Sequence, residues 1–222
     1  MEKQYTTGEE IANASSHAIG IVLIIIAGII LMSKAISGGD VWAVSTVPLY
    51  LIGAFSSYLA STWYHATTQK KRKAKLRKFD HSAIYLHIAG TYSPVTLVLL
   101  REVGYWGWGI FCFVWLCAII GFIFSFTNLK EHSHLKTACF VAMGCSILVA
   151  FKPLVDTVSP LGMMNVVWWI IAGGAAYIIG ALFYSWRKMK YMHGVFHLFC
   201  LMGSACHIMA IYYVIGYNAI NH

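Results

Sequence analysis

The sequence predicts an all-α integral membrane protein, a bundle of seven transmembrane helices with a cytoplasmic N-terminus and a C-terminus outside. Three observations predict it: the composition, seven long apolar runs, and the distribution of positive charge between those runs. Hydrophobic residues occupy 59% of the 222 positions and charged residues only 11%, whereas soluble domains carry about 25% charged residues. The mean hydropathy of +0.68 agrees. This composition excludes the soluble classes of protein.

The seven runs have the length that a helix needs to cross the hydrocarbon core, roughly 20 apolar residues. They cover residues 17–36, 42–64, 81–100, 106–126, 135–152, 164–186 and 193–217. The fifth run is short and leads into Lys152-Pro153. Because the runs are continuous and do not alternate with polar residues, a membrane β-barrel is not expected. No linker rich in proline or serine separates them, so residues 1–222 are expected to form one domain.

The orientation follows from the positive charges in the connections, which favour the cytoplasmic side. With the N-terminus inside, 13 of the 16 Lys and Arg residues are cytoplasmic, and only Lys34, Arg101 and Lys152 are outside. Seven of the 16 fall between Lys70 and Lys78. A basic run can indicate nucleic acid as a partner, but this one is short and flanked by apolar spans. We interpret it as a membrane anchor that can attract anionic headgroups, and expect no nucleic-acid partner.

Polar residues from three of the runs fall at the same depth. His65 ends the second run, Asp80 opens the third, and His193 and His197 open the seventh. Ser61 lies one helical turn deeper than His65. In the orientation above, all five lie within about two turns of the cytoplasmic boundary, given a rise near 1.5 Å per residue. The topology therefore brings residues that are distant in sequence to one side of the membrane.

These residue types suit a zinc site. His193 and His197 are spaced i and i+4, which places two imidazoles on one face of a helix. Catalytic zinc commonly takes three protein ligands and a water molecule, and His65 supplies the third ligand. A carboxylate near the bilayer is costly and tends to mark function, so Asp80 is expected to orient the water or take its proton. Ser61 is expected to donate a hydrogen bond to that water or to a polarised carbonyl.

Each residue also has a simpler interpretation. A histidine pair at this spacing often occurs by chance, and His65 alone can face lipid headgroups. Asp80 can merely balance Arg77 and Lys78. Ser61 can bond its own helix backbone or a neighbouring helix. The agreement in depth favours the metal site over these separate explanations.

Other polar residues are assigned to packing. Glu10, Asn13 and His17 share one helical face before the first run. We interpret Glu10 as part of an interfacial amphipathic segment, whereas Asn13 and His17 can cap or hydrogen-bond the bundle from the cytoplasmic side. His87 and His207 lie deeper in their runs and are interpreted as hydrogen-bonding groups of the core.

Five motifs together resemble the hemolysin III family, which groups with the progestin and adiponectin receptors and more distantly with the alkaline ceramidases. The resemblance covers residues 6–217, with the motifs in order. The motifs are Glu9-Glu-x-x-Asn-x-x-x-His17, Ser61-x-x-x-His65, Phe79-Asp-His-Ser-Ala-Ile-Tyr85, Ala89-Gly-Thr-Tyr-Ser-Pro94 and His193-x-x-x-His197.

The resemblance implies seven helices with the N-terminus in the cytoplasm. It implies Zn²⁺ held by His65, His193 and His197. It also implies that Ser61 and Asp80 surround the water at the metal. In the ceramidase and adiponectin-receptor branches such a site is associated with hydrolysis of a lipid amide. The compact chain is similar to the bacterial members, which implies a multi-pass protein of the bacterial cell membrane.

Two functions from different classes follow. The first is a zinc-dependent membrane hydrolase of a lipid amide or ester, with Asp80 as the base, Ser61 assisting, and membrane lipids as its partners. The second is a non-enzymatic sensor or regulator of membrane lipid state, in which a fourth protein ligand closes a structural zinc site. A transporter is disfavoured because no charge accompanies the mid-span Pro94 or Gly173-Gly174. A retinal protein is disfavoured because the seventh run contains no lysine.

Overall fold

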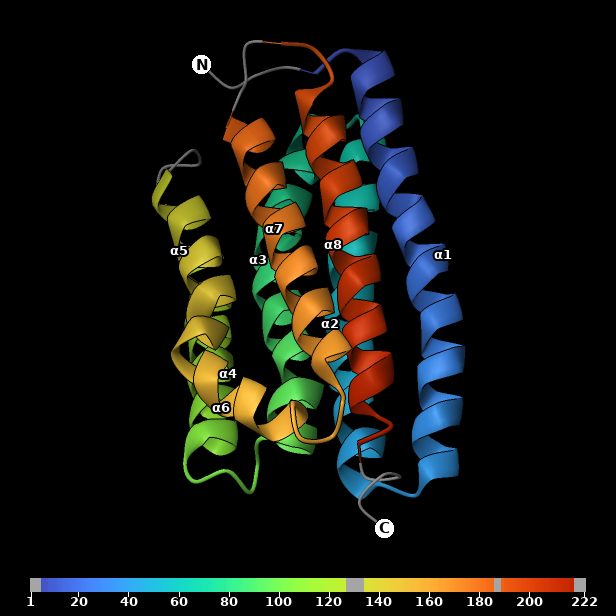
Figure 1. The fold of residues 1–222 in the computed structure, drawn as a ribbon. Helices are drawn as coiled ribbons and strands as arrows, with labels where there is room; N and C mark the ends of the chain where they lie inside the picture. The colour runs from blue at the N-terminus through green and yellow to red at the C-terminus, as the bar shows by residue number, and fades with distance from the viewer. Residues whose placement is uncertain (1–4, 127–133, 186–188, 218–222) are drawn as a thin grey trace.

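The computed structural model describes residues 5–126, 134–185 and 189–217, and within these ranges it contains helices and no strands (Figure 1). Seven helical segments are long and apolar enough to cross a membrane, which confirms the prediction of a seven-span bundle. The first and last described residues lie at opposite ends of the bundle, as an odd number of spans requires (Figure 1). Trp186 and four residues of the charge count, Lys3, Lys130, Arg187 and Lys188, lie outside the described ranges.

The first helix, α1 (Thr7–Gly38), begins ten residues before the predicted position 17 because a capping box starts it. The Thr6 hydroxyl accepts the N–H of Glu9 at 3.3 Å, and the Glu9 carboxylate accepts the N–H of Thr6 at 2.9 Å. Such reciprocal bonds satisfy free donors at a helix N-terminus. At the other end Gly39 adopts a positive φ of 68°, which ends the helix without a Cβ penalty. As a result, Glu9 and Glu10 lie in the first turn of α1.

The second and third helices pack together at two glycines. They are α2 (Val41–Ala66) and α3 (Lys70–Pro94), and α3 continues as a π-helical segment, Val95–Leu99. A Cβ atom at Gly53 would lie 2.4 Å from the carbonyl oxygen of Leu86, and one at Gly90 would lie 2.5 Å from that of Leu49. Glycine therefore lets the two backbones touch, as small residues do in membrane bundles.

The third span is the central one. About 78% of the most apolar window of Lys70–Leu99 is buried, against 22–44% for the other six spans. The helix begins at Lys70 and not at residue 81, so the basic run forms its first turns. It therefore carries positive charge and Asp80 on one continuous helix.

The fifth span is built from three segments after α4 (Trp106–Ser125). They are α5 (His134–Gly144), the 3₁₀ segment Cys145–Ala150 and α6 (Phe151–Val158). The Tyr92 hydroxyl holds the junction, donating to the carbonyl of Gly144 at 2.6 Å and accepting the N–H of Ile147 at 2.9 Å. The helix therefore runs past the predicted end at residue 152, with Pro153 in the first turn of α6, where proline is tolerated.

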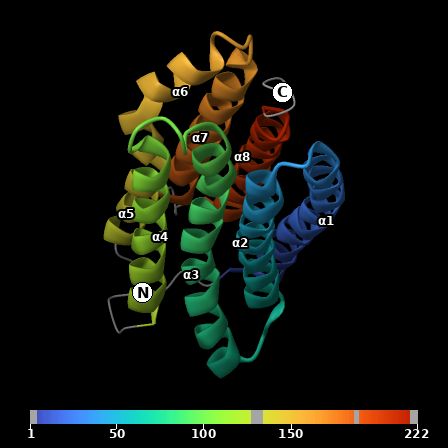
Figure 2. The ribbon, with the colours of Figure 1, turned by 90° about the horizontal axis from the view of Figure 1, so that it is seen from below.

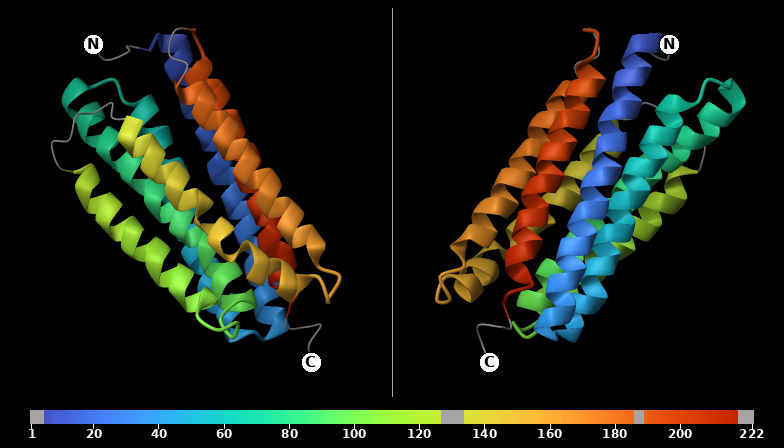
Figure 3. Two further views of the ribbon diagram at one scale, coloured as in Figure 1. Left: turned by 60° about the vertical axis from the view of Figure 1, so that its left-hand side comes forward. Right: turned by 90° about the vertical axis from the view of Figure 1, so that its right-hand side faces the viewer.

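The chain order closes into a ring. The last two helices are α7 (Met164–Ser185) and α8 (Met192–Val214). Helix α8 packs against both α7 and α1, and α1 lies between α8 and α2 (Figures 2 and 3). This closure places the polar start of α1 beside the start of α8. Apolar side chains face outward on the spans, such as Ile29, Leu116 and Leu182, which are 58–69% exposed, as a lipid surface requires.

Candidate metal centre

Three histidines from two helices meet at one end of the bundle. The Nε2 atom of His193 lies 3.1 Å from Nε2 of His65 and 3.1 Å from Nε2 of His197. One ring nitrogen from each of the three lies within 4.8 Å of the others. His65 and His197 are almost completely buried. The arrangement that the sequence predicts from depth alone is thus a compact group of three nitrogen donors that could hold a metal ion.

The donor set and its spacing fit zinc. Zinc is bound by imidazole nitrogen at about 2.0–2.1 Å in a tetrahedral geometry, so two such ligands stand about 3.3 Å apart. The two Nε2 separations of 3.1 Å are close to this tetrahedral edge. Within the described residues, the group of mutually close ligand atoms contains these three nitrogens alone. Three ligands leave a fourth position for water or substrate, as in catalytic sites.

Glu10 supports His65 from the neighbouring helix. Its carboxylate lies 2.6 Å from Nδ1 of His65 and also accepts a bond from the ammonium of Lys73 at 2.9 Å. Metal-binding histidines commonly donate their second ring N–H to a carboxylate, which fixes the tautomer and orients the ring. Lys73 also donates to the carbonyls of Tyr64 and Thr67 at the end of α2. The chain Lys73–Glu10–His65 therefore ties α3, α1 and α2 together at the site.

His197 is held by α1. Its Nδ1 lies 3.0 Å from the hydroxyl of Ser16 and 3.2 Å from the carbonyl of Asn13. The ring of His17 stacks on it, with centroids 3.6 Å apart and planes 20° from parallel. These contacts leave Nε2 of His197 directed to the other histidines. The rings of His65 and His197, which lie on either side of His193, are thus both oriented by residues of α1.

Glu9 fixes the start of α8, where His193 stands. One carboxylate oxygen of Glu9 accepts the N–H of Tyr191 at 3.0 Å, and the other bonds Thr6 in the capping box. Tyr191 has a positive φ of 61°, an uncommon conformation for a residue with a side chain. Because Tyr191 directly precedes α8, its bond to Glu9 sets where the helix begins and so where His193 lies.

Ser61 and Asp80 border the same space as the histidines. Both line a cavity of about 270 Å³ that His193 and His197 also line. Ser61 is 2% exposed, and its hydroxyl has no hydrogen-bond partner among the described residues. Asp80 contacts Nδ1 of His81 at 3.4 Å, so His81 adjoins the site as well. A buried hydroxyl without a partner is costly, so the Ser61 hydroxyl is left with an unused hydrogen bond beside the histidines.

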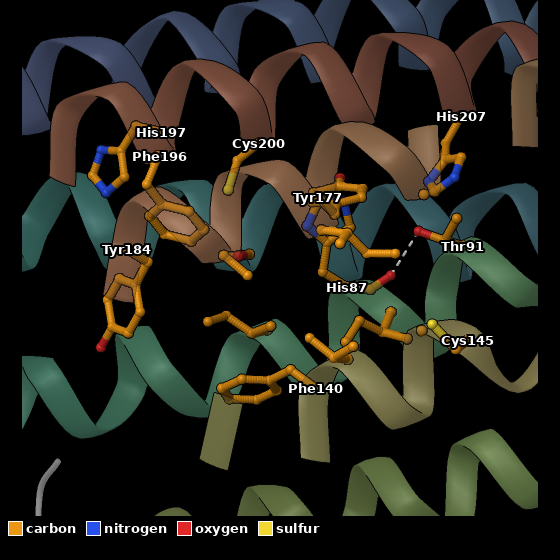
Figure 4. Close-up of a pocket in the computed structure, with 18 of the residues that line it drawn as sticks. His87, Thr91, Phe140, Cys145, Tyr177, Tyr184, Phe196, His197, Cys200 and His207 are labelled. Carbon is orange, nitrogen blue, oxygen red and sulfur yellow. Dashed lines mark hydrogen bonds between the residues drawn. The ribbon is translucent and has the colours of Figure 1, made fainter. Parts of the chain in front are cut away.

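The cavity extends from the three histidines deep into the bundle. Figure 4 shows His197 and Tyr184 at one end and Thr91 and His207 at the other, with Phe196 and Cys200 between them. The lining comes mainly from α3, α7 and α8, with α5 closing one side. A long, mostly apolar cavity thus extends from the candidate metal site into the bundle.

The sequence interpretation differed from the structure for Glu10. We interpreted it as an interfacial residue, whereas it bonds the ring of a site histidine. The spacing of Glu10, Asn13 and His17 on one face was the available signal. That signal could not identify His65 as the partner of Glu10. The contact requires that α1 begins before residue 17 and that α1 packs between α8 and α2.

Comparisons with known proteins agree with this architecture. Residues 5–208 match the family model described as Haemolysin-III related. A "Hemolysin-3" from Bacillus cereus is 41% identical over 197 residues, covering 89% of this chain and 87% of that protein. A "Hemolysin-3 homolog" from Bacillus subtilis is 37% identical, covering 90% and 92%. A human "Monocyte to macrophage differentiation factor" is 27% identical, covering 93% and 84%.

Proposed function

Because this chain belongs to the Haemolysin-III related family, within the progestin and adiponectin receptor superfamily, we propose that it is a zinc-dependent membrane hydrolase of a lipid amide or ester. The observation that carries the proposal is the meeting of three imidazole nitrogens at the head of a long cavity that Asp80 and Ser61 also line. The distribution of positive charge between the spans supports an orientation with this end of the bundle at the cytoplasmic face of a bacterial cell membrane.

His65, His193 and His197 would hold the zinc ion through their Nε2 atoms. When bound, zinc supplies a Lewis acid for a carbonyl and lowers the pKa of water to about 7. Among the described residues the group of close ligand atoms comprises three nitrogens, which would suit a catalytic zinc better than the closed four-ligand set of a structural zinc.

The other residues have roles that follow from their positions. Asp80 acts as general base, taking a proton from the attacking water and returning it to the leaving amine or alcohol as the single bond between the carbonyl carbon and that leaving group breaks. Ser61 donates its free hydroxyl hydrogen to the carbonyl oxygen, where negative charge develops. The apolar length of the cavity holds the acyl chain in register, so that the carbonyl group stays at the histidines.

The test is hydrolysis in reconstituted vesicles. Zinc-loaded protein is incubated with a panel of lipid amides and esters, including ceramide, and released fatty acid is measured by mass spectrometry. We expect release from at least one lipid, and a loss of at least about 10²-fold in Asp80→Asn. Glu102→Gln is the control, because Glu102 is 81% exposed and pairs with Arg101 far from the site.

The hydrolase proposal would be overturned if the wild type released no more fatty acid than His193→Ala from every lipid of the panel. Zinc retained without turnover would then favour the non-enzymatic regulator of membrane lipid state.

A further inference from the structure

A second polar cluster lies in the same cavity, away from the metal centre. His87 and Thr91 come from α3, Tyr177 from α7 and His207 from α8, and all four line the cavity. The ring of Tyr177 lies between the two imidazoles, with centroids 6.4 Å from His87 and 5.6 Å from His207. Figure 4 shows the four side chains gathered in one part of the cavity. Side chains with hydrogen-bonding groups from three helices therefore line one part of the cavity.

The cluster lies at mid-depth in the bundle. His207 stands ten positions beyond His197 on α8, which corresponds to about 15 Å along the helix axis. Between the two sites the lining is mainly apolar, with Ile84, Ile178 and Phe196, and beyond the cluster it is apolar again. The residues beyond it include Val95, Ile147 and Ile211. The cavity is thus apolar, then polar, then apolar along its length.

The protein leaves part of this polar capacity unused. Thr91 donates its hydroxyl hydrogen to the backbone carbonyl of His87 at 2.8 Å, and the hydroxyl groups of Tyr177 and Ser204 lie 2.8 Å apart. Within the described part of the chain, no hydrogen bond engages the ring nitrogens of His87, and Nδ1 of His207 is buried without a partner. Polar side chains at membrane depth are costly unless they are paired. The ring nitrogens of His87 are therefore available to a ligand, whereas the His207 ring bonds the backbone of Ile170 and keeps only its Nδ1 unpaired.

We propose that this cluster is a second binding subsite that recognises a hydroxyl or carbonyl group in the middle of a lipid chain whose head lies at the three histidines. An imidazole can both accept a hydrogen bond from a hydroxyl and donate one to a carbonyl, depending on its tautomer. The apolar stretches on either side hold the alkyl segments that flank the polar group. The substrate class is thus an amide or ester of a chain-oxygenated fatty acid, which rests on the proposed hydrolase function.

The test measures binding and needs no turnover. Zinc-loaded protein in detergent is titrated with three fatty acids: stearate, stearate with one mid-chain hydroxyl, and stearate with a hydroxyl beside the carboxylate. Affinities are obtained by native mass spectrometry. One added hydrogen bond predicts that the mid-chain hydroxyl acid binds about five- to tenfold tighter than stearate. The isomer with its hydroxyl beside the carboxylate should lack this gain.

The variants His87→Leu and His207→Leu remove the polar rings but keep bulky side chains. Each should bring the mid-chain hydroxyl acid to the affinity of stearate while zinc content stays unchanged, which shows that the variant is folded. Ile88→Ala is the matched control, since Ile88 lines the cavity on the same helix as His87. It should change the affinities for all three acids alike and preserve their ratio.

Equal binding of stearate and the mid-chain hydroxyl acid by the wild type would overturn the subsite. The subsite would also be overturned if both leucine variants still preferred the mid-chain hydroxyl acid over stearate. The same holds if the wild type bound none of the three acids. Failure of the hydrolase itself is seen separately, in the vesicle assay, because binding preference is measured without hydrolysis. If the protein prefers the mid-chain hydroxyl acid but hydrolyses no lipid in the vesicle assay, the subsite is supported and the proposed hydrolase function is rejected.

Discussion

Glu10 is the residue whose role is most specific to this fold. It joins the ring of His65 at 2.6 Å to the ammonium of Lys73 at 2.9 Å, so a single carboxylate orients a ligand histidine and connects three helices. Outer partners of this kind commonly affect metal affinity 10–100-fold. Glu10 is therefore expected to tune zinc binding although it does not touch the ion.

Glu10→Gln is predicted to weaken zinc binding about 10–100-fold, because an amide accepts a hydrogen bond from Nδ1 less strongly than a carboxylate and no longer pairs with Lys73. The dissociation constant is measured by competition with a chromophoric chelator. Glu102→Gln removes an exposed carboxylate and should bind zinc as the wild type does. Equal affinity in Glu10→Gln and the wild type would show that the contact does not support the ligand.

Residue types and topology together could predict the three histidines, Asp80 and Ser61 as neighbours, because helix direction fixes depth. They could not predict the contacts from α1. The sequence predicts Glu10 as part of an interfacial segment and His17 as a capping or hydrogen-bonding group, because sequence spacing does not reveal how the ring of helices closes. The availability of the His87 ring nitrogens is hidden for the same reason: burial and pairing at mid-depth depend on which helices face one another.

At the scale of elements, the packing of α2 on α3 holds the site. His65 ends α2 and Asp80 lies on α3, and the glycines at positions 53 and 90 bring these helices into backbone contact. A side chain at either position would push the helices apart. The separation of His65 from Asp80 therefore depends on two residues that contribute no chemistry.

Gly90→Ala is predicted to lower the melting temperature by roughly 2–10 °C, since its Cβ would lie 2.5 Å from a backbone oxygen and the added atom forces the helices apart. Thermal unfolding is followed by tryptophan fluorescence in detergent. Gly109→Ala is the matched control on α4, because nothing lies within 4 Å of a Cβ there. A melting temperature for Gly90→Ala equal to that of Gly109→Ala would contradict the close packing.

The number of spans was predictable from hydropathy, but the ends of the helices were not. A search for apolar runs does not register polar residues. The capped start of α1 was therefore assigned to a separate interfacial segment, and the basic first turns of α3 to a connection. The fifth span is interrupted by the 3₁₀ segment, and its continuation through Pro153 to Val158 depends on the tertiary bonds of the Tyr92 hydroxyl. Local sequence carries no signal for those bonds.

At the scale of the whole molecule, the charge distribution predicts that the metal centre faces the cytoplasm. Thirteen of 16 basic residues are assigned to the side of the N-terminus, and seven spans then predict a C-terminus outside. The proposed hydrolase would therefore act on lipids of the inner leaflet, with the cavity pointing from that leaflet toward the middle of the bilayer.

This orientation predicts the behaviour of C-terminal fusions in bacteria. Alkaline phosphatase, which needs the oxidising periplasm to form its disulfides, should be active when fused to the C-terminus, and green fluorescent protein exported there should remain dark. Fusions after α4 report the cytoplasmic side and serve as the internal control. A fluorescent C-terminal fusion with inactive phosphatase would reverse the topology.

The central claim is an open zinc site made of three histidines, and metal content tests it most directly. Wild type, His193→Ala and Asp80→Asn are purified without chelators and analysed for zinc by elemental mass spectrometry. The account predicts about one zinc per chain in the wild type, loss in His193→Ala because a ligand is missing, and retention in Asp80→Asn because Asp80 lies outside the ligand group. A wild type without zinc, or a His193→Ala variant that keeps it, would contradict the account.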